Sequence, residues 1–114
     1  NINLKCNEDL IMELMNILID NAIDAAKQCE EKEITITFRK DNKKNKQLFI
    51  IENSCKDNNI STTKIFEKGY STKEHNSGIG LWKVHNILAK NENVDLFTTV
   101  QNNIFRQQLE IFYV

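Results

Sequence analysis

The alternation of apolar and polar positions along the chain indicates two helices and four strands. Between Glu8 and Cys29, apolar residues recur at steps of three and four, which is the period of an amphipathic helix. These apolar positions are Leu10, Ile11, Leu14, Ile17, Leu18, Ala22 and Ala25. A second segment with the same period predicts a helix from Gly78 to Lys90.

The predicted strands come in two pairs. Ile34 to Phe38 and Leu48 to Ile51 are rich in β-branched and aromatic residues, and a polar, lysine-rich stretch joins them. Val94 to Val100 and Ile104 to Tyr113 flank Asn102-Asn103, a dipeptide suited to a tight turn. We therefore expect two antiparallel hairpins.

The order helix, two strands, long connection, helix, two strands predicts an α+β fold. We expect a two-layer α/β sandwich, with a mixed, mostly antiparallel sheet and the helices on one face. A chain of 114 residues fits one domain spanning 1–114. Ile2 to Cys6 could add a strand. The polar connection from Ser54 to Ser77, broken only by a possible helical turn at 61–66, has the character of a lid over a ligand.

Composition excludes several classes of function. The net charge of −1 gives no reason to expect nucleic acid or a membrane surface as a partner. No apolar run approaches the ~20 residues that cross a bilayer. The three cysteines lack paired spacing, and neither His75 nor His85 has a cysteine or carboxylate at metal-ligand spacing. We expect a reducing compartment, and neither a disulfide framework nor a zinc site.

Two of the three glycines stand at the entrance of the second predicted helix. Gly78 and Gly80 follow the hydroxyl-rich run from Gly69 to Lys73. Without side chains, glycines allow the free N–H groups and positive end of a helix to approach a phosphate. The same pattern also fits a tight turn with no ligand, so this motif alone leaves both interpretations open.

An asparagine interrupts the apolar stripe of the first helix. Asn21 projects into that stripe, and Glu13, Asp20 and Asp24 lie along one shoulder of it. A buried amide must find hydrogen bonds, and a neighbouring strand could provide them. An amide oxygen beside carboxylates also suits Mg²⁺ that carries nucleotide phosphates.

Together these motifs resemble the GHKL superfamily of ATP-binding domains, which includes sensor histidine kinases, gyrase, Hsp90 and MutL. Asp20 to Ala26 resembles its N box, Phe66 with Gly69 to Lys73 its F box and lid, and Gly78 to Leu81 its G2 box. The resemblance is closest to AgrC-like peptide-pheromone receptor kinases. It extends there to the sequences Ile51 to Cys55 and Ile65 to Lys73 and to the Asn102-Asn103 hairpin.

The resemblance implies a Bergerat-type fold that binds ATP and Mg²⁺, with Asn21 as the metal ligand. Asn53 stands where the family has an aspartate that accepts from the adenine amino group; Ser54 and Cys55 replace Asn and Gly, and Asn76 replaces a glycine. An amide there lacks charge assistance, so weaker binding is expected. The implied cofactor-binding residues are Asn21, Asp24, Asn53, Phe66, Lys68, Ser71, Thr72, Lys73, Gly78, Gly80 and Leu81.

One departure from the family bears on the reaction. Its ATPase members carry a glutamate four residues before the N-box asparagine, and Ile17 occupies that place. Hydrolysis is disfavoured, whereas transfer to an imidazole needs chiefly positioning and charge neutralisation. The resemblance thus implies a kinase, a transferase of two-component signal transduction.

No histidine of this chain matches the phosphoacceptor. The resemblance places it on a separate dimerisation domain, with a response regulator downstream, in a bacterial quorum-sensing receptor anchored in the membrane. The chain would be its cytoplasmic catalytic domain, and we expect it to be monomeric by itself. Two alternatives remain: a degenerate nucleotide-binding or interaction module without kinase activity, and a serine kinase of the anti-sigma type.

Overall fold

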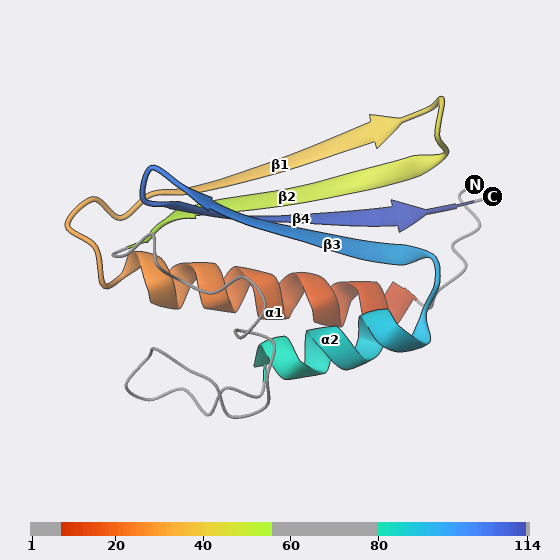
Figure 1. Ribbon diagram of the computed structural model, residues 1–114, viewed down its shortest axis with the longest axis horizontal. Coiled ribbons are helices and arrows are strands. Elements are labelled where there is room, and N and C mark those ends of the chain that lie inside the picture. The colour runs from red at the N-terminus through yellow and green to blue at the C-terminus, as the bar shows by residue number, and fades with distance from the viewer. Residues whose placement is uncertain (1–7, 56–79, 114) are drawn as a thin grey trace.

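The computed structural model describes residues 8–55 and 80–113, which form a four-stranded sheet with two helices on one face (Figure 1). The predicted α+β class is confirmed. In chain order the described elements are α1 (Glu8–Ala26), β1 (Ile34–Asp41), β2 (Lys46–Ser54), α2 (Gly80–Lys90), β3 (Val94–Gln101) and β4 (Ile104–Phe112).

The strands lie in the order β1-β2-β4-β3, and every pair among the described strands is antiparallel. Both predicted hairpins are present. Asn102 and Asn103 have φ angles of 52° and 60°, the left-handed pair that a two-residue hairpin turn requires and that asparagine tolerates. At the other hairpin, Asp41 Oδ1 accepts hydrogen bonds from the backbone N–H groups of Lys43 and Lys44.

The core lies between the helices and the inner face of the sheet. Because side chains alternate along a strand, Phe49 and Ile51 of β2 and Leu109 of β4 point toward α1, and each is at most 1% exposed. Leu14 and Leu18 of α1 complete this centre. α2 packs beside α1 and against β3, with Val84 fully buried. Neither helix in the described residues is both long and apolar enough to cross a membrane.

Several predicted boundaries were wrong by a few residues. α1 ends at Ala26 rather than Cys29, because the N–H groups of Gln28 and Cys29 bond to carbonyls three residues back, forming a tighter turn. The residues beyond Ala26 are mostly polar, so little apolar surface holds them on the sheet. β1 and β2 run further than their apolar stretches because the backbone ladder continues to Asp41 and Lys46. The possible strand at 2–6 and the turn at 61–66 lie outside the described residues.

Candidate functional site

The start of α2 lies directly against the C-terminal half of α1. A Cβ atom placed on Gly80 would stand 3.3 Å from Cγ2 of Ile17 and 3.8 Å from Nδ2 of Asn21. The asparagine and the glycine that the sequence singled out, far apart along the chain, therefore meet in space. Glycine eases this approach, since a Cβ atom here would require Ile17 to shift by a few tenths of an ångström.

This contact brings an amide side chain to the N-terminal end of a helix. Asn21 is half-buried, and its Nδ2 atom is closed to solvent. α2 has 11 residues, and its first backbone N–H groups have no carbonyl of their own helix to bond. A helix end of this kind favours anions such as phosphate. Leu81, the next residue, packs against the hydrophobic core and fixes this end of α2 in place.

Asn53 lies at the end of β2, on the same inner face as Phe49 and Ile51. It is only 2% exposed, and its Nδ2 donates a 2.9 Å hydrogen bond to the carbonyl of Ser54. With the amide nitrogen engaged in this way, the oxygen is the atom that Asn53 can offer to a donor such as an adenine amino group.

Ser54 and Cys55, which depart from the family pattern, have structural contacts. The Ser54 hydroxyl accepts from the N–H of Glu33 (3.2 Å), and the Ser54 N–H donates to the Glu33 carbonyl (3.0 Å). The Cys55 N–H donates to the Asn103 carbonyl. These bonds tie the end of β2 to the start of β1 and to the β3–β4 turn, which holds Asn53 in position.

The two asparagines of the candidate site lie toward the same end of the molecule. α1 and β2 run in the same direction and pack against each other (Figure 1). Asn21 is in the last two turns of α1, and Asn53 is the second-last residue of β2. The inner layer at this end is therefore where a ligand would meet both amides and the start of α2.

The acidic residues beside Asn21 do not gather into a metal site. Glu13 forms an ion pair with Lys83 of α2 at 3.7 Å, and both Asp20 and Asp24 are exposed. Within residues 8–55 and 80–113, no group of three His, Cys, Asp or Glu side chains is arranged to hold a metal ion. The expected grouping of Glu13, Asp20 and Asp24 on one shoulder of α1 stays a prediction, and Glu13 also pairs with Lys83 of α2.

The described residues nevertheless fit a nucleotide with its magnesium ion. The side-chain oxygen of Asn21 would be one neutral ligand of Mg²⁺. Few protein ligands are needed, because phosphates and water complete the coordination shell of the ion. The backbone N–H groups at the start of α2 would take phosphate, and Asn53 an adenine. When bound, the nucleotide supplies the transferable phosphoryl group.

Six residues predicted to bind the cofactor fall outside the described part of the chain. They are Phe66, Lys68, Ser71, Thr72, Lys73 and Gly78. Of the predicted set, Asn21, Asn53, Gly80 and Leu81 lie in or beside the inner layer, while Asp24 is exposed on α1.

Sequence reasoning missed Gln107, a buried polar residue on the inner face of β4. It is 3% exposed, pairs with Ile51 and Thr98 of the neighbouring strands, and its Oε1 accepts from the Thr98 hydroxyl. Its Nε2 is buried and has no hydrogen-bond partner among the residues that the structure describes. The signal was available, since Gln107 breaks the apolar alternation that continues through Leu109 and Ile111.

The outer face of the sheet carries a polar ladder that the sequence did not reveal. Lys46 donates to Oε1 of Glu110 at 2.6 Å, Gln108 Nε2 donates to Oε2 of Glu110 at 2.7 Å, and Arg106 donates to Gln108. Burial, the largest single influence, raises the pKa of Glu110, but the hydrogen bonds from Lys46 and Gln108 and the positive charges of Lys46 and Lys44 outweigh it. The pKa is lowered overall.

Comparison with known proteins agrees with this architecture. The family model described as "GHKL domain" matches residues 7–112. Among solved structures, the catalytic domain of the histidine kinase ThkA has 23% identity and a TM-score of 0.65, over 89% of this chain and 64% of that one. The mycobacterial sensor histidine kinase MprB has 13% identity and a TM-score of 0.73, over 95% and 73%.

The chain thus spans less than two thirds of the length of the ThkA structure, and both likenesses concern the fold. The sequence has no significant match among curated proteins. GHKL domains bind ATP, and the contact of Asn21 with the start of α2 is consistent with such a site. The family match covers nearly the whole chain, and the chain therefore belongs to the GHKL domain family.

Proposed function

We propose that this chain is the catalytic and ATP-binding domain of a two-component sensor histidine kinase. It binds Mg-ATP and transfers the γ-phosphate to a histidine on a separate dimerisation domain. The observation that carries the proposal is the contact of Gly80 with Ile17 and Asn21, because it joins the metal-binding amide to a phosphate-binding helix start.

The same contact favours transfer to histidine over hydrolysis. Ile17 presents a methyl group to Gly80, at the position where a water-activating carboxylate would stand in the ATPases of the superfamily. A neutral imidazole is already a nucleophile and needs no such base. The chain's own residues therefore have to position the phosphates and neutralise charge, which are the main requirements of phosphoryl transfer.

The wider context of the proposal rests on the sequence motifs. We place the domain in an AgrC-like, quorum-sensing receptor of a bacterium, on the cytoplasmic side of a membrane anchor. Its partners would be the dimerisation and phosphoacceptor helices of the same protein and a response regulator, with no nucleic acid. The similarity in fold to ThkA and MprB supports the kinase part of this context.

One observation favours a second candidate, a degenerate module that no longer uses ATP. Asn53 is 2% exposed, and its amide nitrogen donates to the carbonyl of the next residue, Ser54. An adenine ring must therefore enter a closed layer to reach it. Without the charge of an aspartate, the hydrogen bond gained there is weaker. A serine kinase of the anti-sigma type is disfavoured by Ile17.

The test is phosphotransfer with the upstream helical domain of the same protein. With labelled ATP, the chain should label a histidine on that domain, giving an acid-labile, base-stable product. Asn21→Ala should lose this transfer, while Asn16→Ala, a matched change at an exposed position of the same helix, should retain it. Acid-stable label on serine or threonine, or rapid phosphate release by the chain alone, would contradict the proposal.

A further inference from the structure

The side-chain amide of Gln107 is buried in the inner layer, with a hydrogen bond to one of its two ends. The residue is 3% exposed, and its Oε1 accepts from the Thr98 hydroxyl. Its Nε2, which carries two hydrogens, is closed to solvent and has no partner among the residues that the structure describes. A buried donor without an acceptor lowers the stability of a fold, so such a group calls for a ligand or an ordered water.

Strand register places Gln107 next to Asn53. Across the β2–β4 ladder, Asn53 pairs with Phe105, and Ile51 pairs with Gln107. Gln107 is therefore the diagonal neighbour of Asn53 on the inner face. Diagonal neighbours of a sheet lie about 7–8 Å apart, within reach of long side chains. A ligand that meets the Asn53 oxygen would thus lie within reach of Gln107 as well.

The existing hydrogen bonds determine which atoms the two amides can offer. Because the Thr98 hydroxyl donates to Oε1 of Gln107, Nε2 is the end left to donate. Asn53 uses its Nδ2 to donate to the Ser54 carbonyl, and its oxygen is left to accept. One acceptor and one donor are therefore neighbours in the inner layer. This pattern is complementary to a ligand with a donor and an acceptor on adjacent atoms.

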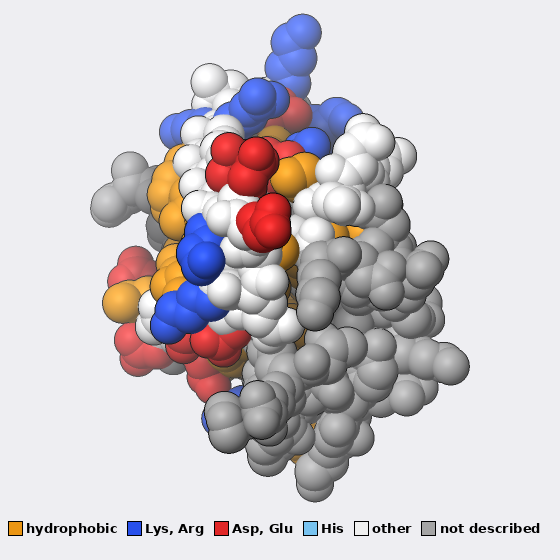
Figure 2. Space-filling view, turned by 90° about the vertical axis from the view of Figure 1, so that its left-hand side faces the viewer, with side chains coloured by type: hydrophobic (Ala, Val, Ile, Leu, Met, Phe, Trp, Pro, Cys, Tyr) orange, Lys and Arg blue, Asp and Glu red, His pale blue; other side chains and the backbone are white. Residues whose placement is uncertain are grey.

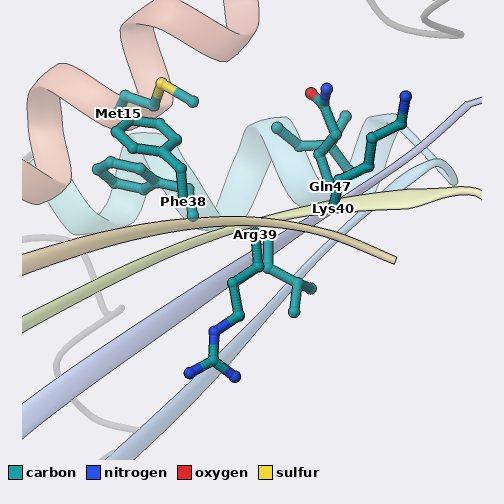
Figure 3. Close-up of a pocket in the computed structure, with 8 residues that line it drawn as sticks. Met15, Phe38, Arg39, Lys40 and Gln47 are labelled. Carbon is teal, nitrogen blue, oxygen red and sulfur yellow. The ribbon is translucent and has the colours of Figure 1, made fainter. Parts of the chain in front are cut away.

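The hollow of about 270 Å³ between α1 and the β1–β2 hairpin differs from the surroundings of Gln107. Met15 and Phe38 lie there on the helix side of the sheet, while Arg39 points to the opposite side (Figure 3). Of its other polar side chains, Lys40 is exposed and Gln47 is half-buried, so water can reach them. The fully buried amide is therefore the stronger indication of a ligand.

Figure 2 shows the end of the molecule at which β2 ends and β4 begins. Acidic and basic side chains both lie on the described surface there, together with hydrophobic ones. Adenine and guanine are both uncharged, so charge on this surface does not select between them. Selection requires hydrogen-bonding groups that contact the edge of the base.

We propose that Gln107 recognises the base of the bound nucleotide, by donating a hydrogen bond from Nε2 to the ring nitrogen N1 of adenine. Asn53 accepts from the adjacent amino group, so the two residues match the donor and the acceptor of adenine together. Guanine carries an acceptor and a donor in the opposite order and is mismatched at both residues. The inference rests on the proposed function, because it names a further specificity-determining residue of the same ATP site.

Calorimetric titration in the presence of Mg²⁺ with ATP and with 1-deaza-ATP, in which a C–H group replaces N1, tests this contact. The wild-type chain should bind ATP about tenfold more tightly than 1-deaza-ATP, as expected for one buried hydrogen bond. In Gln107→Leu, ATP should bind about tenfold more weakly than in the wild type, and the two nucleotides should bind equally. The preference for ATP over GTP should also decrease. Thr98→Val should lower the ratio of the ATP and 1-deaza-ATP affinities, because it releases Oε1 and allows the amide to turn.

Gln108→Leu is the matched control, since Gln108 is the next residue and belongs to the polar ladder of the outer face. It should leave the ratio of the two affinities unchanged. Without nucleotide, Gln107→Leu should unfold at a urea concentration at least as high as that of the wild type, because it removes a buried donor that lacks an acceptor. This measurement also checks that the variant folds.

Equal affinities of the wild-type chain for ATP and 1-deaza-ATP overturn this inference alone, as does a preference for ATP over 1-deaza-ATP that persists in Gln107→Leu. In both cases the chain binds ATP, and the proposed function stands. If neither nucleotide binds to the folded wild-type chain, the proposed function fails, and this inference fails with it.

Discussion

Polar side chains lie on both faces of the sheet, and the two faces use them differently. On the outer face, Lys46, Glu110, Gln108 and Arg106 bond to one another in a ladder. On the inner face, Gln107 keeps a buried amide nitrogen without a partner among the described residues. A satisfied network adds stability, whereas an incompletely bonded amide in the core lowers it.

In our proposal, the outer network stabilises the fold, and the inner polar residues belong to a ligand site. Asn21, Asn53 and Gln107 are polar groups in a layer otherwise built from leucine, isoleucine and phenylalanine. A polar group in such a layer costs stability unless it is hydrogen-bonded, as Asn53 is to the Ser54 carbonyl. Changes on the outer face should therefore alter folding without altering nucleotide binding, and changes on the inner face should do the reverse.

The largest effect should come from Asn21→Ala on the inner face. We expect nucleotide affinity in the presence of Mg²⁺ to fall at least 100-fold, about 2.7 kcal/mol, because the proposed metal ligand is lost. Thermal unfolding should remain cooperative at nearly the same temperature. Asn16→Ala is the control. An unchanged dissociation constant, with stability lower by about 1–3 kcal/mol, would make Asn21 a structural amide only.

On the outer face, Glu110→Ala should lower the free energy of unfolding by about 2 kcal/mol, because it leaves the nearly buried Lys46 ammonium without its carboxylate. Urea unfolding measures the loss. Nucleotide affinity should not change. A drop in affinity comparable to that of Asn21→Ala would contradict the assignment of nucleotide binding to the inner face alone.

Gly80→Ala should weaken nucleotide binding about tenfold, or about 1.4 kcal/mol, since the added methyl group lies 3.3 Å from Ile17 and shifts the start of α2. Combining it with Ile17→Ala, which removes the opposing methyl group, should recover much of the affinity. If the double variant binds no better than Gly80→Ala, the contact with Ile17 is not the cause.

Asn53→Asp should bind ATP more tightly by about 1 kcal/mol, since a carboxylate gives a charge-assisted hydrogen bond to the adenine amino group. Asn53→Leu, of similar size, should bind poorly. Titration of both variants under the same conditions decides the point. Equal affinities would mean that adenine is not recognised at this residue.

The pH dependence of stability should show a smaller contribution from Glu110. Its pKa is lower in the folded chain than its ordinary value of 4.5, so its stabilisation is present above pH 4.5 and is lost as the pH falls through the folded pKa. Between pH 5 and pH 3, the wild-type chain should therefore lose more stability than Glu110→Gln. Parallel slopes for the two chains would contradict this assignment.

Much of the fold followed from the sequence because its signals are local. The 3.6-residue period identified α1, and runs of β-branched and aromatic residues identified the first strand pair. The turn at Asn102-Asn103 followed from asparagine's tolerance of positive φ angles. The end of α1 was misplaced because an apolar period does not say where packing against the sheet stops.

The features that the sequence could not predict depend on which segments pack together in space. The apolar alternation of β1 resembles that of β2, yet Phe38 is exposed and Phe49 is buried, because α1 lies over β2. Asn21 and Gly80 were identified separately from motifs, but their contact follows from how α2 packs on α1. Lys46 and Glu110 pair through strand register, which no short motif reveals.

Calorimetric titration of the wild-type chain with a non-hydrolysable ATP analogue tests the central claim, that the inner layer is a nucleotide site. With Mg²⁺ present, we expect saturable binding at one site per chain, and chelation of Mg²⁺ should weaken it at least tenfold. An absence of binding at millimolar nucleotide, with the chain folded, would contradict the account and favour the degenerate module.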